Sequence, residues 1–275
     1  MKVWFVTGAS RGFGALIAEK ALSVGDAVIA TGRNLQDVQA RLGTHPRLLV
    51  TRLNVTDELS IQQTIDAGIS RFGRIDILVN NAGYGVLGAV EETSRKEVED
   101  LFSTNVFGLL AVIRGVLPHM RRQRSGHIMN FSSIGGYEAY LGWGVYGASK
   151  FAVEGISEAL CQEVALLNIN VTIIEPGFFR TDFLDQQSLV STEVKISDYD
   201  STVGEMRNFA VGANHQQPGD PNKLASAIIL LSQTPNPPLR LPLGSDTIER
   251  LRKKNKFVES ELLLWEDVAR STDFS

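Results

Sequence analysis

The first residues of the chain restrict its fold most, because closely spaced glycines join an apolar run to a helical pattern. Lys2–Val6 is a short apolar run, typical of a buried strand. Gly8, Gly12 and Gly14 follow it and lead into the amphipathic segment 15–23. A strand, a tight turn and a helix in this order let the backbone approach a pyrophosphate, whose charge the helix N-terminus stabilises. An ordinary strand-to-helix turn is the alternative, but the flanking strand and helix both lie where the motif requires them, which favours a dinucleotide site.

Short apolar runs alternate with helical patterns along the rest of the chain. The further predicted strands are Ala27–Thr31, Arg47–Leu53, Ile75–Val79, His127–Phe131, Asn170–Ile174 and Arg240–Leu243. The predicted helices are Leu35–Leu42, one from Thr56 or Asp57 to Phe72, Arg95–Leu117, Val153–Leu166 and Pro221–Leu231. Strands separated by helices imply right-handed crossovers, so the pattern predicts an α/β fold with a doubly wound, mostly parallel sheet. Ligands of such sheets bind beyond the carboxyl ends of the strands.

The segment Asn130–Lys150 places groups with complementary proton chemistry where a predicted strand gives way to a helix. Tyr146 and Lys150 are four residues apart, which puts them on one face of a helix. A neighbouring cation lowers the pKa of a phenol from about 10 toward neutrality, where a general acid or base works best. Ser133 lies near the end of the strand and could hold a substrate oxygen. Tyr146 and Lys150 alone would also fit a half-exposed helix with no function.

Asn105 interrupts the long apolar helix Arg95–Leu117. A buried amide with all its hydrogen bonds made explains such a residue, and so does a side chain or kink that holds an ordered water near Lys150.

Composition excludes several classes of protein. The chain has 275 residues, 43% of them hydrophobic, and its net charge of −4 gives no overall attraction to nucleic acid or anionic membranes. The basic runs Arg121–Arg124 and Arg250–Lys256 are interpreted as solvated helix ends. One cysteine, Cys161, forms no intrachain disulfide. Since no uninterrupted apolar run reaches about 20 residues, we expect no membrane span and a cytoplasmic protein. We also expect no metal site.

The chain resembles the short-chain dehydrogenase/reductase family. The matching motifs, in the family's order, are TGASRGFG (7–14), NNAG (80–83), Asn105, Ser133, YGASK (146–150) and PGFFRT (176–181). The resemblance is strong over residues 1–185. It implies one Rossmann-like domain with a sheet of about seven strands and helices on both faces. It also implies a nicotinamide cofactor and hydride transfer to or from a carbonyl group.

The resemblance assigns roles to individual residues. Tyr146 would donate the proton in the reducing direction, and Ser133 would donate a hydrogen bond to the carbonyl oxygen. Lys150 would lower the phenol pKa and hold the nicotinamide ribose, while Asn105 would complete a proton relay through water. Ser132, the competing serine, is given a structural role. The residues expected to contact the cofactor are Gly8, Ser10, Arg11, Gly12, Phe13, Gly14, Arg33, Asn54, Val55, Asn81, Ala82, Gly83, Tyr146, Lys150, Pro176, Gly177 and Thr181.

The end of the second strand predicts which nicotinamide cofactor is used. Enzymes that use NAD place an acidic side chain about 20 residues beyond the glycine-rich turn, where it binds the adenosine ribose and repels a 2′-phosphate. Gly32 occupies that position here. Arg33 follows it, and Arg11 projects from the glycine-rich turn, so two guanidinium groups could converge on one phosphate. Solvated arginines are the alternative, but the missing acid also favours NADP(H).

The substrate side gives less information. Aromatic residues gather around the motif loops and typically line an apolar pocket: Tyr84, Tyr140, Trp143, Phe178 and Phe183, with Phe179 beside them. Residues 184–218 are polar with little periodicity, as expected for a mobile substrate lid. Ser245–Lys254 and Glu259–Ala269 read as two surface helices, a C-terminal extension (245–275) that we expect to pack over the sheet edge or the substrate cleft.

These features predict an NADPH-dependent reductase of ketones or aldehydes, with bulky or steroid-like compounds among the candidate substrates. A non-catalytic NADP-binding regulatory protein and an epimerase or dehydratase of the same fold remain as alternatives. The helices Arg95–Leu117 and 145–166 resemble those that form the dimer surface in the family. A homodimer is therefore expected, with a tetramer as a further possibility.

Overall fold

The computed structural model describes residues 1–274. A seven-stranded parallel sheet has the strand order β3-β2-β1-β4-β6-β7-β9. Its strands are β1 (Val3–Val6), β2 (Ala27–Gly32), β3 (Leu48–Arg52), β4 (Ile77–Asn80), β6 (Gly126–Phe131), β7 (Ile169–Pro176) and β9 (Arg240–Leu243). The predicted doubly wound α/β fold is confirmed, with every strand of this sheet parallel.

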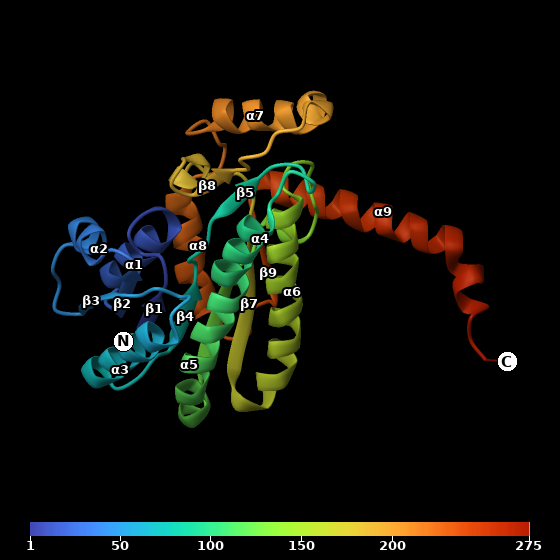
Figure 1. The fold of residues 1–275 in the computed structure, drawn as a ribbon. Coiled ribbons are helices and arrows are strands. Elements are labelled where there is room, and N and C mark those ends of the chain that lie inside the picture. The colour runs from blue at the N-terminus through green and yellow to red at the C-terminus, as the bar shows by residue number, and fades with distance from the viewer. Residues whose placement is uncertain (275) are drawn as a thin grey trace.

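Helices cover both faces of the sheet (Figure 1). The α-helices of the described residues are α1 (Gly12–Ser23), α2 (Leu35–Leu42), α3 (Glu58–Phe72), α4 (Arg95–Phe102), α5 (Leu109–Gln123), α6 (Gly144–Val164), α7 (Glu205–Ala213), α8 (Pro221–Gln233) and α9 (Ser245–Arg270). The N-cap residues Asn34, Asp57 and Asp220 accept hydrogen bonds from the first backbone N–H groups of α2, α3 and α8. These bonds satisfy donors that a helix N-terminus leaves unpaired, which is why the helices begin there.

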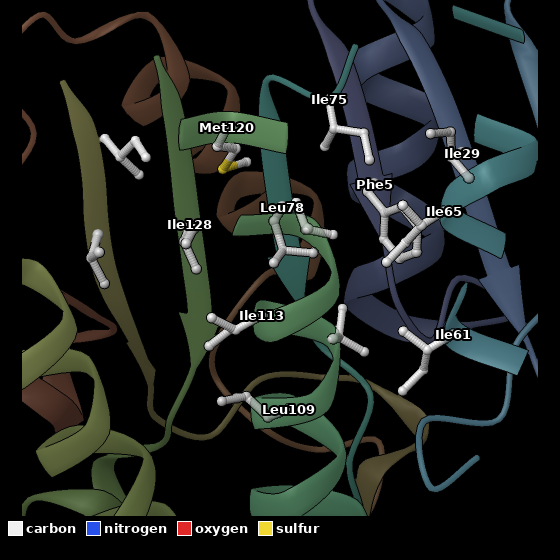
Figure 2. Packing of buried hydrophobic residues seen from close by; sticks show 14 of the residues in the cluster. Phe5, Ile29, Ile61, Ile65, Ile75, Leu78, Leu109, Ile113, Met120 and Ile128 are labelled. Atoms are coloured by element: carbon white, nitrogen blue, oxygen red, sulfur yellow. The ribbon is translucent and has the colours of Figure 1, made fainter. Parts of the chain in front are cut away.

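Alternate residues of β1 point into two cores. Val3 and Phe5 pack with residues of α3, α5 and α6, while Trp4 and Val6 pack with residues of α1, α2 and α8. Figure 2 shows the first core, where Phe5 and Leu78 from the sheet lie near Ile65 of α3 and Ile113 of α5. Burial on both faces explains why these strands are continuously apolar rather than alternating.

The helical run Arg95–Gln123 could cross a membrane by length and composition alone, since its most apolar window has a mean hydropathy of 1.5. Val112, Val116 and Met120 within this run are fully buried against the sheet. The run is also interrupted by a π-helical segment, Ser103–Gly108, at the place where the sequence predicts a break. The run is therefore part of the core of this fold rather than a membrane span.

The lid segment, residues 184–218, lies beyond the carboxyl ends of the strands (Figure 1). It holds β8 (Leu189–Ser191), which pairs with β5 (Gly85–Leu87), and the helix α7. Buried Glu92 accepts hydrogen bonds from the backbone of Ile196 and from Arg207 of this segment. The segment thus has more regular structure than its weak periodicity predicts, and its role as a lid stays a prediction.

The C-terminal extension differs from the sequence prediction in its number of helices. We expected two helices, but α9 is one continuous helix because residues 245–270 contain no glycine or proline to end it. Its first turns contact β9 and the loop after β6. Its second half projects away from the rest of the protein (Figure 1), so only the first half packs as predicted.

Candidate active site

Thr7 joins the glycine-rich turn after β1 to the loop after β4. Its hydroxyl accepts hydrogen bonds from the backbone N–H groups of Asn81 and Ala82 at 3.0 and 2.9 Å. The Asn81 amide donates in turn to the carbonyl oxygens of Thr7 and Gly8, both at 3.0 Å. These bonds hold two motif loops in fixed positions at the centre of the sheet.

Two glycines make this turn possible. Gly8 has a φ of 68°, in the left-handed region that favours glycine. A Cβ on Gly14 would lie 2.2 Å from the carbonyl oxygen of Gly8. Gly14 therefore lets the start of α1 lie directly against the turn.

Ser133, Tyr146 and Lys150 come together in the cleft beyond β4, β6 and β7. The loop after β6 carries Ser133, whose hydroxyl accepts a hydrogen bond from the Gly135 N–H at 3.0 Å. Tyr146 and Lys150 lie one turn apart on α6. The Lys150 ammonium donates to the Phe131 carbonyl at 2.8 Å and lies 5.8 Å from the centre of the Tyr146 ring. Ser133 and Tyr146 therefore share one end of the cleft, with the Lys150 ammonium near the phenol ring.

The predicted direction of the Tyr146 shift is wrong. Burial raises the pKa of Tyr146 to about 12, and the hydrogen bond with Ser133 lowers it by a smaller amount. The four-residue spacing brings the Lys150 ammonium over the ring, but loss of hydration of the phenolate dominates. Burial likewise lowers the pKa of Lys150 to about 8, against the opposite effect of the Glu154 charge. Tyr146 thus keeps its proton at neutral pH.

Asn105 lies in the π-helical segment between α4 and α5, and its amide is fully bonded. Its oxygen accepts from the Tyr84 N–H at 3.1 Å, and its nitrogen donates to the Tyr84 carbonyl at 2.9 Å and to Ser149 at 3.2 Å. This matches the simpler interpretation of a satisfied buried amide. Asn105 fixes the backbone of the loop after β4, 3.0 Å from where a Cβ on Gly83 would lie.

Arg11 and Arg33 both line the cleft, but only Arg11 is engaged by other side chains of the described residues 1–274. The Arg11 guanidinium donates to Gln187 and, at 2.6 Å, to Ser188 of the lid segment. Within the same residues, no hydrogen bond or ion pair holds the exposed Arg33. The alternative that both arginines are simply solvated therefore does not hold for Arg11.

An aromatic group covers the other end of the cleft. The Trp143 ring stacks on Phe183 with centroids 6.4 Å apart and meets Tyr146 edge-on at 5.6 Å. Tyr140 lies nearby, with the Arg250 guanidinium 4.3 Å from its ring centre. Phe179 instead packs against Phe13, with ring centroids 5.5 Å apart, at the edge of the core formed by α1 and α8. Its ring therefore packs against this core rather than with the aromatic rings at the substrate end.

The cleft has a volume of about 1370 Å³ and gathers almost all the predicted site residues. The members that line it are Gly8, Ser10, Arg11, Gly12, Phe13, Arg33, Asn54, Val55, Asn81, Ala82, Gly83, Tyr84, Ser133, Tyr140, Trp143, Tyr146, Lys150, Pro176, Gly177, Phe178, Thr181 and Phe183. Gly14 and Asn105 lie beneath its wall.

Comparison with known families and structures agrees with this geometry. The family described as short chain dehydrogenase matches residues 2–190. The chain belongs to the short-chain dehydrogenase family. It is therefore an oxidoreductase, in a family whose structures include complexes with NAD or NADP.

Three similar proteins illustrate the relationship. A short-chain dehydrogenase from Streptomyces avermitilis is 42% identical, with a TM-score of 0.92 over 99% of this chain and 100% of its own. A 3-ketodihydrosphingosine reductase from Bacteroides thetaiotaomicron is 37% identical over 88% of both chains. A serine dehydrogenase complexed with NADP⁺ is 30% identical, with a TM-score of 0.73 over 88% of this chain and 94% of its own.

The cleft of this short-chain dehydrogenase fits the dinucleotide that the family implies. No side chain caps the N-terminus of α1, and its first turn carries no acidic residue. The starts of α6 and α9 also lack a side-chain cap, but α1 is the helix that follows the glycine-rich turn, and Arg11, Gly12 and Phe13 at its start line the cleft. Uncapped N–H groups that open on the cleft beside Gly12 are suited to bind phosphate oxygens.

Sequence reasoning about this short-chain dehydrogenase missed a buried polar layer beneath the cleft. Asn80 donates to Asn130 at 2.9 Å, and Asn130 donates to Ser157 at 2.9 Å. Asn80 ends β4 and Asn130 lies in β6, next to the apolar residues of each strand. This position beside apolar runs is the one sequence signal that could have indicated the polar layer.

A second missed group joins α6, β7 and β9. Arg240 lies 3.2 Å from the carboxylate of Glu175 and 3.1 Å from that of Glu154, and it also pairs with Glu158. Burial, and then the charge of Glu154, raise the pKa of Glu175 to about 7, whereas Arg240 lowers it. Glu154 lies one turn after Lys150 on α6, so this group lies directly behind the site.

Proposed function

We propose that this short-chain dehydrogenase reduces a ketone or aldehyde to an alcohol with NADPH. The observation that carries the proposal is the meeting of Ser133, Tyr146 and Lys150 in one cleft with an uncapped helix N-terminus. Binding a nucleotide alone does not require a buried phenol, a hydroxyl and an ammonium at the far end of the cleft.

The cofactor would supply the hydride. The glycine-rich turn and the N–H groups of α1 would hold its diphosphate, and Asn81, Ala82 and Gly83 would lie along its ribose. Lys150 would reach the nicotinamide ribose from α6.

The proton chemistry follows from the state of the side chains. Reduction builds negative charge on the carbonyl oxygen, which Ser133 and Tyr146 can stabilise by donating hydrogen bonds. With its pKa raised to about 12, Tyr146 is protonated at neutral pH and can donate its proton to the new alkoxide. The Lys150 ammonium over the ring would stabilise the phenolate that remains.

The preference for NADPH rests on the end of β2. Gly32 has no carboxylate to repel a 2′-phosphate, and a Cβ there would lie 2.7 Å from the Val38 side chain, so the turn is also tightly packed. Arg33 is exposed beside this position and lines the cleft. The complex of the similar serine dehydrogenase with NADP⁺ supports the same choice.

The aromatic wall supports a bulky, largely apolar carbonyl compound as substrate. Trp143, Phe183 and Tyr140 would contact the body of the substrate, while only the reacting oxygen meets Ser133 and Tyr146. The similar 3-ketodihydrosphingosine reductase, named for an amphiphilic long-chain ketone, is consistent with that class.

Oxidation of NADPH, followed at 340 nm with a panel of aliphatic, aryl and steroid ketones and aldehydes, tests this function. We expect turnover with bulky apolar carbonyls and slower turnover with NADH. Tight NADPH binding without oxidation over the whole panel would favour the regulatory alternative. Conversion of a hydroxy compound without net NADPH consumption would favour an epimerase or dehydratase.

We also propose a cytoplasmic homodimer, which could associate further into a tetramer. Phe107 is 62% exposed beside α5, and Phe151 is 44% exposed on α6. These side chains supply apolar surface on the two helices that the family resemblance indicates for the dimer. Light scattering of the purified chain at micromolar concentration measures the mass, and a monomer would contradict this proposal.

A further inference from the structure

Gln217 is a buried residue of the cleft whose side-chain oxygen has no partner. It lies near the end of the lid segment, lines the cleft and is 3% exposed. Its Oε1 is buried and accepts no hydrogen bond from any group in residues 1–274. An acceptor in such a position is costly to leave unpaired, so a ligand that brings a polar hydrogen into the cleft would complete it.

Backbone contacts fix Gln217 beside the loop after β7. Its carbonyl accepts a hydrogen bond from Arg180 Nε at 3.3 Å. Two residues further on, Gly219 donates to the Phe178 carbonyl at 3.0 Å and accepts from the Arg180 N–H at 2.9 Å. A Cβ on Gly219 would lie 2.6 Å from the Phe179 ring, so the two segments approach closely. The loop after β7 therefore sets the position of Gln217, although its own segment belongs to the lid.

The place of this loop along the sheet selects the part of a dinucleotide that Gln217 meets. β7 is the neighbour of β6, whose following loop carries Ser133, whereas β2 lies four strand positions away from β7. At about 4.8 Å per position, the ends of β2 and β7 are roughly 19 Å apart. The adenine end of the cofactor, which we place at β2, is therefore out of reach of Gln217. The nicotinamide must lie beside Ser133, because it gives hydride to the carbonyl that Ser133 binds.

Hydrogen-bonding chemistry narrows the choice further. Diphosphate oxygens are ionised and only accept hydrogen bonds, and the reacting group of a ketone or aldehyde has no polar hydrogen. The hydroxyls of the nicotinamide ribose would face Lys150 and Tyr146 on α6. The donor that remains at this end of the cofactor is the N–H group of the nicotinamide carboxamide.

We propose that Gln217 binds the nicotinamide carboxamide, with its side-chain oxygen accepting a hydrogen bond from the amide N–H. The inference rests on the proposed function, which supplies the cofactor. A held carboxamide keeps the ring from turning about its bond to the ribose, so Gln217 also orients the hydride toward the carbonyl carbon. The lid segment then meets the nucleotide site near both of its ends, since Ser188 accepts a hydrogen bond from Arg11.

A thermodynamic cycle with a cofactor analogue tests this contact without a substrate. The 3-acetylpyridine analogue of NADP⁺ has a methyl group in place of the amide nitrogen, so it lacks the donor. In calorimetric titration the wild type should bind NADP⁺ roughly 5- to 30-fold more tightly than the analogue, as expected for one buried hydrogen bond. In Gln217→Leu the two ligands should bind equally, because the acceptor is gone. The corresponding NAD⁺ pair serves the same cycle if the wild type prefers NAD⁺.

The neighbouring glutamine gives a matched control. Gln216 is exposed and is not among the residues that line the cleft, so Gln216→Leu should keep the wild-type ratio of the two affinities. Without cofactor, Gln217→Leu should unfold at the same urea concentration as the wild type or a higher one, since it removes an unpaired acceptor. A glutamine with a purely structural role would instead be lost at a cost in stability.

The outcomes separate this contact from the proposed function. A wild-type ratio near one, or an unchanged ratio in folded Gln217→Leu, would overturn the contact even if the wild type reduces carbonyl compounds. A ratio that is lost in Gln217→Leu supports the contact even if no carbonyl compound of the panel is reduced. Absence of dinucleotide binding by the wild type would overturn both. Circular dichroism checks folding, and Gln217→Met, with an unbranched side chain of similar length, replaces the leucine variant if that variant does not fold.

Discussion

The nucleotide end of the cleft is lined mainly by backbone groups and glycines, whereas the substrate end is lined mainly by side chains. At the nucleotide end, backbone groups and glycines of the loops after β1 and β4 lie in contact and are joined by Thr7 and Asn81. At the substrate end, the surface is made of the aromatic side chains of Tyr140, Trp143 and Phe183 from separate loops, with Arg250 of α9 over the Tyr140 ring. The first end can tolerate few changes of sequence, whereas the second can change its shape by exchanging side chains.

Tyr146→Phe should have the largest effect, because it acts where the two ends meet. The substitution removes the transferable proton and little volume, so turnover should fall by roughly 10²–10⁴. NADPH affinity, measured by fluorescence titration, should stay within a few-fold of the wild type. Near-normal turnover would show that another group donates the proton.

Gly14→Ala tests how rigid the nucleotide end is. The new Cβ would lie 2.2 Å from the carbonyl oxygen of Gly8, and backbone must move to accept it. Such overpacking costs about 1–3 kcal/mol of stability, and the displaced turn should also weaken NADPH. Chemical denaturation and cofactor titration measure the two effects.

Gly212→Ala is the matched control at the other end. Gly212 lies in α7 of the lid segment, and a Cβ there meets nothing within 4 Å. Alanine is preferred to glycine in a helix, so the variant should be as stable as the wild type or slightly more stable. Equal losses for both variants would remove the contrast between the two ends.

Arg33→Ala should separate the two nicotinamide cofactors at the nucleotide end. Loss of a charge-assisted hydrogen bond to the 2′-phosphate should weaken NADPH by about 1–3 kcal/mol and scarcely change NADH. The ratio of kcat/KM for the two cofactors measures this directly. If the wild type prefers NADH, the interpretation of Gly32 and Arg33 is wrong.

The same contrast explains what the sequence could predict. The first strand and the glycine turn depend on local spacing, so Lys2–Val6 with Gly8, Gly12 and Gly14 was sufficient to indicate them. The convergence of Ser133, Tyr146 and Lys150 could also be predicted, because the loop after one strand and the next helix carry all three.

Other features depend on residues that are distant in sequence. Arg11 meets Ser188 across 177 positions, and Arg250 covers Tyr140 from α9. The sign of the Tyr146 shift depends on burial by several loops, which no spacing records. The pairing of β5 with β8 was missed because both strands are only three residues long.

The smallest effect is expected beneath the cleft, at a carboxyl group that belongs to neither end. Because burial raises the pKa of Glu175 to about 7, the folded state keeps this proton to a higher pH than the unfolded state does. Between the ordinary value of 4.5 and about 7 this carboxyl group binds fewer protons in the unfolded chain, so its contribution to the free energy of unfolding should fall as the pH rises. Above pH 7 the loss should stay constant, on the order of 1–3 kcal/mol, because the pKa of about 7 already includes the opposing charge of Arg240 and solvent screens part of the remainder.

Glu175→Gln should remove that pH dependence, since the neutral amide has no proton to release. Glu158→Gln is the control, because it changes a half-exposed partner of the same Arg240 and should keep the slope. Urea unfolding of the three proteins from pH 5 to pH 8 measures the difference. Buried His127, whose pKa burial lowers to about 4, adds stability as the pH rises toward 6.5 in all three proteins, so the test compares their slopes. If Glu175→Gln keeps the wild-type slope, Glu175 is ionised in the fold, held by Arg240 more strongly than its burial opposes. The group behind Lys150 would then carry one more negative charge, and the ammonium at the active site would be correspondingly harder to deprotonate.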